Sequence, residues 1–71
     1  MTPREYEAAR TALGWTHAQV AETLGVGDRT PYRYASGEIP EPAARLLRLL
    51  VLLRLTIDQG KFKKLVEELR A

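Results

Sequence analysis

The residues best suited to chemistry in this 71-residue chain are two arginines and two tyrosines that lie close together near its middle. They are Arg29, Tyr32, Arg33 and Tyr34, within the stretch GVGDRTPYRYASG. An arginine can donate two parallel hydrogen bonds to the O6 and N7 atoms of guanine, and a phenol ring can contact a thymine methyl group or bond a phosphate. Side chains of these types therefore suit a surface that binds a charged, flat partner.

A helical wheel separates the side chains of this stretch into two groups. At about 100° per residue, Pro31, Tyr34 and Ala35 fall on one side of a short helix. The other side carries, within roughly a quarter turn, Arg29, Tyr32, Arg33 and Ser36. The apolar side can pack on neighbouring helices while the other side stays exposed. The wheel alone does not distinguish a binding surface from an ordinary solvated helix face.

Pro31 fits such a helix only if it lies in the first turn. With Asp28 as the N-cap, Pro31 is the third helical residue, whose N–H has no partner within the helix anyway. With Gly27 as the cap, Pro31 would forfeit the first helical hydrogen bond. We therefore expect Asp28 to cap a short helix that starts late, and we prefer this role to a hydrogen bond from cytosine N4.

Capping signals predict helices along the rest of the chain. Thr2 and Glu5 form one capping box and Thr16 and Gln19 a second, and glycines follow the expected helix ends. The expected helices run from Pro3 to Gly14, from His17 to Leu24, up to Ala35 or Ser36, from Pro42 to Ile57, and from Lys61 onward after a break at Gly60. No segment has a strand pattern. The predicted fold is all-α, with five helices in one domain over residues 1–71.

The composition excludes several classes of protein. The hydrophobic content of 45% supports a core, and the absence of cysteine excludes disulfides and thiolate metal sites. We expect a cytoplasmic protein with no signal peptide, membrane span, cofactor, bound metal or small-molecule substrate. His17, the one histidine, is expected to be an exposed polar residue rather than a catalytic base, so no enzyme is predicted. A net charge of +2 permits an anionic partner without requiring one.

The predicted helix from Pro42 to Ile57 has more leucines than one inner face needs. Its inner face is filled by Leu46, Leu47, Leu50, Val51, Leu53 and Ile57. Leu49, Leu52 and Leu55 lie outside that face, and an exposed apolar strip indicates a partner surface. Alternatively, the last helix covers these leucines with its own apolar face of Phe62, Leu65, Val66 and Leu69.

The segment from Trp15 to Pro40 resembles the lambda-repressor-like helix-turn-helix family, also called Cro/Xre. The matching features are the Thr16 cap, a small Ala21 between the two helices, Gly25 and Val26 in the turn, and the SGE-x-P sequence that begins at Ser36. The resemblance implies a five-helix domain with the helix-turn-helix at about residues 16–36 and the helices of residues 42–70 in the core and in dimerisation. Two residues depart from the family pattern, which usually has Val or Ile in place of Pro31 and often Gln in place of His17.

This resemblance also implies roles for single residues. The second helix of the motif would enter the major groove of double-stranded DNA. Arg29, Tyr32 and Arg33 would then read bases, and the backbone contacts would come from Thr16, His17, Thr30 and Ser36. The expected function is a sequence-specific transcriptional regulator, a prokaryotic or phage repressor that binds a palindromic operator as a homodimer.

A protein-interaction module is the rival interpretation. An adaptor or antitoxin-like bundle would use the leucine-rich helix as its working surface. The small net charge favours this alternative, because Glu22 and Asp28 offset Arg29 and Arg33 within the motif. Only a DNA-binding protein would release counterions on binding, so the salt dependence of affinity distinguishes the two functions.

Overall fold

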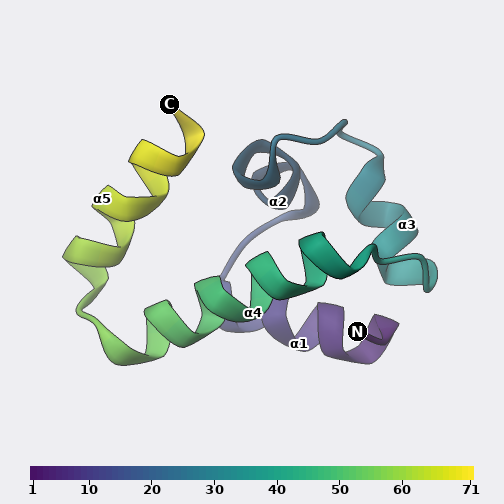
Figure 1. Cartoon of the computed structure of the whole chain (residues 1–71), viewed down its shortest axis with the longest axis horizontal. Coiled ribbons are helices and arrows are strands. Elements are labelled where there is room, and N and C mark those ends of the chain that lie inside the picture. The colour runs from purple at the N-terminus through teal and green to yellow at the C-terminus, as the bar shows by residue number, and fades with distance from the viewer.

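The chain folds into five helices without any strand, in a computed structural model that describes residues 1–71 (Figure 1). The helices are α1 (Pro3–Leu13), α2 (His17–Leu24), α3 (Thr30–Ser36), α4 (Glu41–Thr56) and α5 (Gln59–Arg70). Helix α4 runs along the length of the molecule, with α5 at one end and α3 at the other. The predicted all-α class and the number of helices are confirmed.

Both predicted capping boxes form in the structure. The Thr2 hydroxyl oxygen accepts a hydrogen bond from the Glu5 N–H at 3.1 Å, and the Glu5 carboxylate accepts one from the Thr2 N–H at 2.8 Å. Thr16 and Gln19 make the same exchange at 3.2 and 2.8 Å. Because these bonds satisfy N–H groups that have no partner inside the helix, they fix the starts of α1 and α2. The hydrogen bond from the Thr2 N–H also lowers the pKa of the Glu5 carboxyl.

The prediction that Asp28 caps α3 is wrong. Arg29 occupies the N-cap position, and no side chain makes a capping hydrogen bond there. The Thr30 N–H instead donates to the Gly27 carbonyl at 3.0 Å, which closes a turn through Asp28 and Arg29. Pro31 is thus the second helical residue rather than the third. Its missing N–H still costs no helical hydrogen bond, so the physical argument for a proline in the first turn holds at a later start.

The start of α5 also differs from the sequence prediction. Asp58 is its N-cap and accepts a hydrogen bond from the Lys61 N–H at 2.9 Å. Gly60 therefore lies inside the first turn and does not break the chain. The break falls at Ile57, which has extended backbone angles. The prediction placed the break at the glycine and overlooked an aspartate with a strong preference for the cap position.

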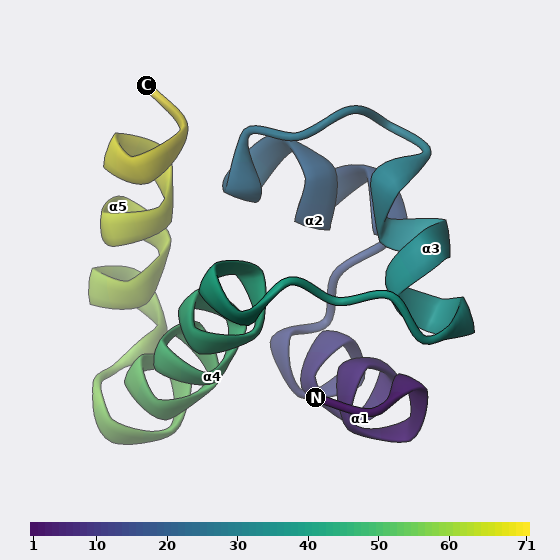
Figure 2. The same cartoon turned by 45° about the vertical axis from the view of Figure 1, so that its right-hand side comes forward.

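The core lies between α1, α3 and α4, and α2 and α5 each add buried side chains to it. Helix α1 contacts α3 and α4, and α2 contacts α3 and α5 (Figure 2). The buried core cluster comprises Tyr6, Leu13, Val20, Tyr34, Leu47, Leu50, Phe62 and Val66. On α2, Thr23 is buried, whereas Leu24 at the end of the helix and Val26 in the following turn are half-buried.

Helix α5 does not cover the leucines of α4. Helix α5 packs more closely on α2 than it does on α4, and Phe62 packs on Trp15 with ring centroids 6.2 Å apart. This orientation turns Leu65 and Leu69 outward, and each is 46% exposed. Of the four residues on the predicted apolar face, only Phe62 and Val66 reach the core, so the alternative in which this face covers the leucines of α4 is wrong.

Arg70 fastens the end of α5 to α2. Its Nε donates a hydrogen bond to the Thr23 hydroxyl at 2.8 Å, and its Nη1 lies 3.2 Å from a Glu22 carboxylate oxygen. The guanidinium carbon also lies 5.5 Å from the centroid of the Trp15 ring. A hydrogen bond, an ion pair and a cation–π contact thus meet on one side chain.

We expect Arg70→Ala to lower the free energy of unfolding by about 1–3 kcal/mol, because it removes a charge-assisted hydrogen bond and the contact with Trp15. Urea unfolding followed by Trp15 fluorescence measures this loss. Lys64→Ala removes the same charge from an exposed position of α5 and should change the stability by less than about 0.5 kcal/mol. Equal effects of the two substitutions would contradict the role given to Arg70.

Pro31→Val should change the stability by less than about 1 kcal/mol. Valine loses more freedom on folding than proline, a cost of about 0.4–1 kcal/mol, and its packing in the buried slot can offset part of that. At the second helical position the restored N–H gains no helical partner. Thermal unfolding of the two proteins measures the change. A stabilisation of about 3 kcal/mol would mean that Pro31 lies in the helix interior rather than in the first turn.

Candidate nucleic-acid interface

The exposed side of α3 carries the residues that the helical wheel placed there. Arg29, Arg33 and Ser36 are exposed, and Tyr32 is 60% exposed. On the opposite side, Pro31 and Tyr34 are buried. The wheel prediction is therefore confirmed, and the helix presents two guanidinium groups and a phenol from one solvent-facing surface.

The inner side of α3 is held by aromatic packing. The Tyr34 ring meets the Tyr6 ring edge to face, with centroids 5.8 Å apart and planes at 77°. Tyr6 is fully buried, and burial also raises the pKa of the Tyr34 phenol. Because Tyr6 belongs to α1, this contact anchors α3 on the core and leaves its polar side outward.

Neither arginine of α3 makes an ion pair within the chain, as every salt bridge involves other basic residues. Glu22, which the sequence suggested as a neutralising charge for this region, is instead bound by Arg70. Asp28 remains exposed in the turn before α3. The surface around α3 is therefore more basic than a count of charges in the motif indicates.

Four residues were predicted to contact the DNA backbone, and the side chains of three of them already form hydrogen bonds within the chain. The Thr16 oxygen caps α2, and Thr30 is half-buried as the first residue of α3. The Ser36 hydroxyl donates to the Arg33 carbonyl at 2.9 Å. In this rotamer it can only accept a further hydrogen bond, and it must rotate before it can donate one to a phosphate. The helix start at Thr16 and His17 favours anions through its unpaired N–H groups.

His17 is not the exposed polar residue that the sequence predicted. Its Nδ1 lies 2.8 Å from the Tyr6 hydroxyl, and its side chain is only 20% exposed. The imidazole stacks on the Tyr6 ring with centroids 5.7 Å apart, and it contacts the Tyr32 ring at a tilt of 41° with centroids 4.5 Å apart. No pattern in the sequence predicts this contact, because the three residues come from three helices and have no regular spacing.

The hydrogen bond between Tyr6 and His17 has a defined direction when the imidazole is neutral. Burial raises the pKa of the Tyr6 phenol to about 12, so the phenol keeps its proton and donates it to Nδ1. The imidazole proton then lies on Nε2, which is 3.9 Å from a Glu7 carboxylate oxygen. That Nε2–H is the group of His17 left to donate to a partner.

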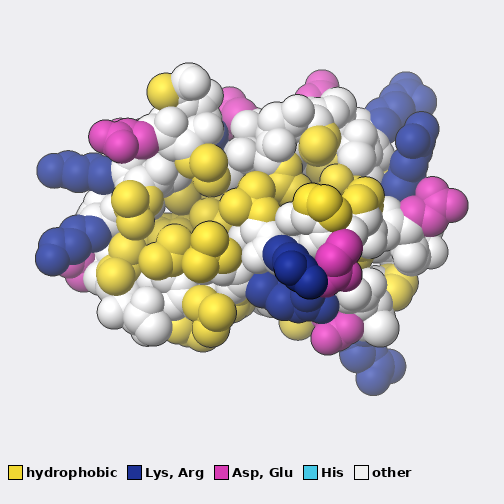
Figure 3. Space-filling view, viewed as in Figure 1, with side chains coloured by type: hydrophobic (Ala, Val, Ile, Leu, Met, Phe, Trp, Pro, Cys, Tyr) yellow, Lys and Arg dark blue, Asp and Glu magenta, His cyan; other side chains and the backbone are white.

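Exposed leucines form a second surface, which is apolar where the exposed side of α3 is basic and polar. Leu49, Leu52 and Leu55 are 52%, 58% and 72% exposed, which confirms that they lie outside the inner face of α4. Hydrophobic side chains gather over the face where α4 and α5 meet (Figure 3). An exposed strip of leucines on one helix is typical of a partner surface.

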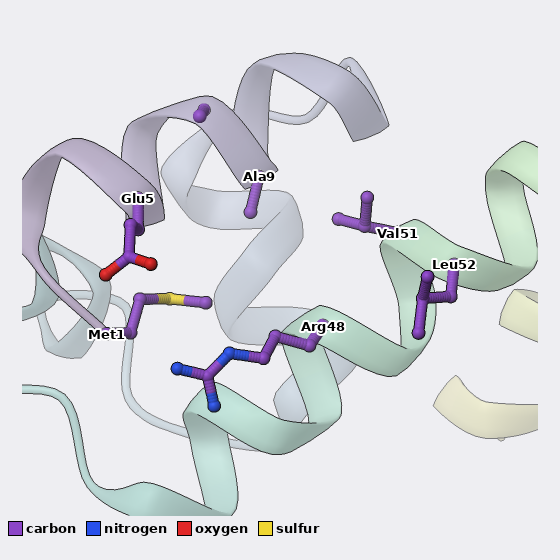
Figure 4. Close-up of a pocket in the computed structure, with 7 residues that line it drawn as sticks. Met1, Glu5, Ala9, Arg48, Val51 and Leu52 are labelled. Carbon is purple, nitrogen blue, oxygen red and sulfur yellow. The ribbon is translucent and has the colours of Figure 1, made fainter.

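A shallow groove of about 400 Å³ lies between α1 and α4 next to this surface. Met1, Glu5 and Ala9 line it from one side, and Arg48, Val51 and Leu52 from the other (Figure 4). Apolar atoms dominate its walls, and no cluster of three or more metal-binding side chains occurs anywhere in the chain. None of the five helices combines the length and the apolar character needed to cross a membrane.

Comparisons with protein-family models, with curated proteins and with solved structures find no match to this chain. The assignment of a function therefore depends on the residues and the geometry described above.

Proposed function

We propose that this protein is a sequence-specific DNA-binding transcriptional regulator of the lambda-repressor-like type, with α2 and α3 as its helix-turn-helix. The main support is the exposed side of α3, where Arg29, Tyr32 and Arg33 face solvent and neither arginine has an intramolecular ion-pair partner. The contact between α2 and α3 and the five-helix order agree with the resemblance noted in the sequence.

In this proposal α3 enters the major groove with its exposed side toward the bases. The two guanidinium groups bond guanines, and the Tyr32 phenol contacts a thymine methyl group or a phosphate. Thr16, His17, Thr30 and Ser36 contact the sugar–phosphate backbone and fix the position of α3 in the groove. The protein acts by occupying an operator and blocking the polymerase, without catalysis.

A homodimer completes the proposed regulator. The partner surface is the leucine strip of α4, since Leu49, Leu52 and Leu55 are more than half exposed and α5 leaves them uncovered. A two-fold axis through this strip presents two copies of α3 to successive major grooves, which matches a palindromic operator.

The same leucines support the rival function, an adaptor or antitoxin-like interaction module. Two measurements with the purified protein distinguish the functions. Selection from random duplex DNA should recover a palindrome, and log K should fall linearly with log salt as phosphate contacts release counterions. An unselected pool together with salt-independent binding would favour the interaction module.

Arg33→Ala should weaken specific binding by about 1–3 kcal/mol and relax the preference at one base position in each half-site. The reason is that Arg33 lies centrally on the exposed side of α3. Binding titrations against the selected site and against its single-base variants measure both effects. Lys63→Ala, which removes one charge from α5, should leave the base preference unchanged. An equal loss on specific and random DNA would reduce Arg33 to a phosphate contact.

Leu52→Glu should give a folded monomer that binds the operator poorly. Leu52 is 58% exposed, so a charge there spares the core but repels its own copy across a two-fold axis. Sedimentation and circular dichroism measure the mass and the fold. Ala12→Glu adds the same charge to an exposed position of α1 and should leave the dimer intact. A wild type that is monomeric at micromolar concentration and on DNA would refute the dimer.

A further inference from the structure

A continuous row of aromatic rings leads from the core to the proposed DNA-binding surface. Tyr34 contacts Tyr6 edge to face at 5.8 Å, and Tyr6 stacks on His17 at 5.7 Å with nearly parallel planes. His17 in turn contacts Tyr32 at 4.5 Å. The row begins at the two buried rings of Tyr34 and Tyr6 and ends at the Tyr32 phenol, which is 60% exposed.

From Tyr6 outward, each ring of this row restricts the movement of the next one. Tyr6 is fixed by burial, and its hydroxyl fixes the imidazole of His17 through a 2.8 Å hydrogen bond. His17 is also the first residue of α2, so its backbone is held by the Thr16 capping box. The Tyr32 hydroxyl makes no hydrogen bond in the structure, and the His17 ring is its one aromatic neighbour.

An exposed tyrosine on a helix normally exchanges between side-chain rotamers on a fast timescale. Contact with a held imidazole removes part of that freedom before any partner binds. A side chain that is already in position loses less entropy on binding and reads a base more selectively. The packing of His17 therefore matters for Tyr32 beyond any direct contact of His17 with DNA.

We propose that Tyr6 and His17 are positioning residues that hold Tyr32 in one rotamer and thereby set the base preference that Tyr32 provides. This inference rests on the proposed function. It gives His17 a second role, because the Nε2–H remains available for a phosphate while the ring face positions Tyr32. Ring packing and hydrogen-bond donation can be separated by substitution.

The first experiment uses the free protein. In nuclear magnetic resonance spectra, the β-proton couplings of Tyr32 report its rotamer, and ring-to-ring Overhauser effects report its contact with His17. We expect one dominant rotamer in the wild type and in His17→Phe, which keeps a ring between Tyr6 and Tyr32, and averaged couplings in His17→Ala. Glu7→Gln, which alters the charge beside His17 but not the stacked rings, should resemble the wild type. Averaged couplings in the wild type would overturn the inference.

The second experiment uses the selected operator and its single-base variants. Tyr32→Ala identifies the base position that Tyr32 reads. We expect His17→Ala to reduce the preference at that same position about tenfold, and the double variant to lose no more preference than Tyr32→Ala alone. His17→Phe should bind all sequences more weakly, because it has no N–H donor, yet keep the base preference.

The outcomes separate this inference from the proposed function. Should His17→Ala weaken all sequences equally, or should the losses of the single variants multiply in the double variant, the positioning role is overturned while DNA recognition stands. A wild type without any sequence preference would overturn both. The spectra of the same samples show whether each variant is folded, and His17→Phe retains a ring at the site if His17→Ala does not fold.

Discussion

The buried hydroxyl of Tyr6 is the constraint on which much of the structure depends. A phenol hydroxyl that is buried without a hydrogen-bond partner destabilises the folded protein, and here the partner is His17. Satisfying that one group draws the start of α2 against α1. The same ring supports α3 through Tyr34, so a single side chain of α1 sets where both helices of the proposed motif lie.

Much of the fold could be predicted because its signals are local. The capping boxes at Thr2 and Thr16 depend on residues three apart, and the side of α3 that is buried depends on helical periodicity. The leucines outside the inner face of α4 follow from the same periodicity. Where two local signals competed, the prediction failed: Gly60 was preferred to Asp58 as the boundary of α5, and Asp28 was preferred to a turn as the start of α3.

The rest of the candidate site depends on contacts between distant residues, which no local pattern reveals. The contacts of His17 with Tyr6 and Tyr32 require three helices to meet, and the pairing of Glu22 with Arg70 requires the end of the chain to pack on α2. Counting charges in the motif therefore underestimated the basic character of the surface. The exposure of Leu65 and Leu69 also depends on contacts between distant residues, because it follows from the packing of α5 on α2.

The hydrogen bond between Arg70 and Thr23 spans 47 residues, and this separation has a consequence for how the chain matures. Contacts that close a long loop form late, because the loop must first lose its freedom. During synthesis the middle helices emerge well before Arg70, so α2 is exposed to solvent on the side that α5 later covers. Until α5 packs, Trp15 and the adjoining side of α2 therefore lack the contacts that Phe62 and Arg70 make with them.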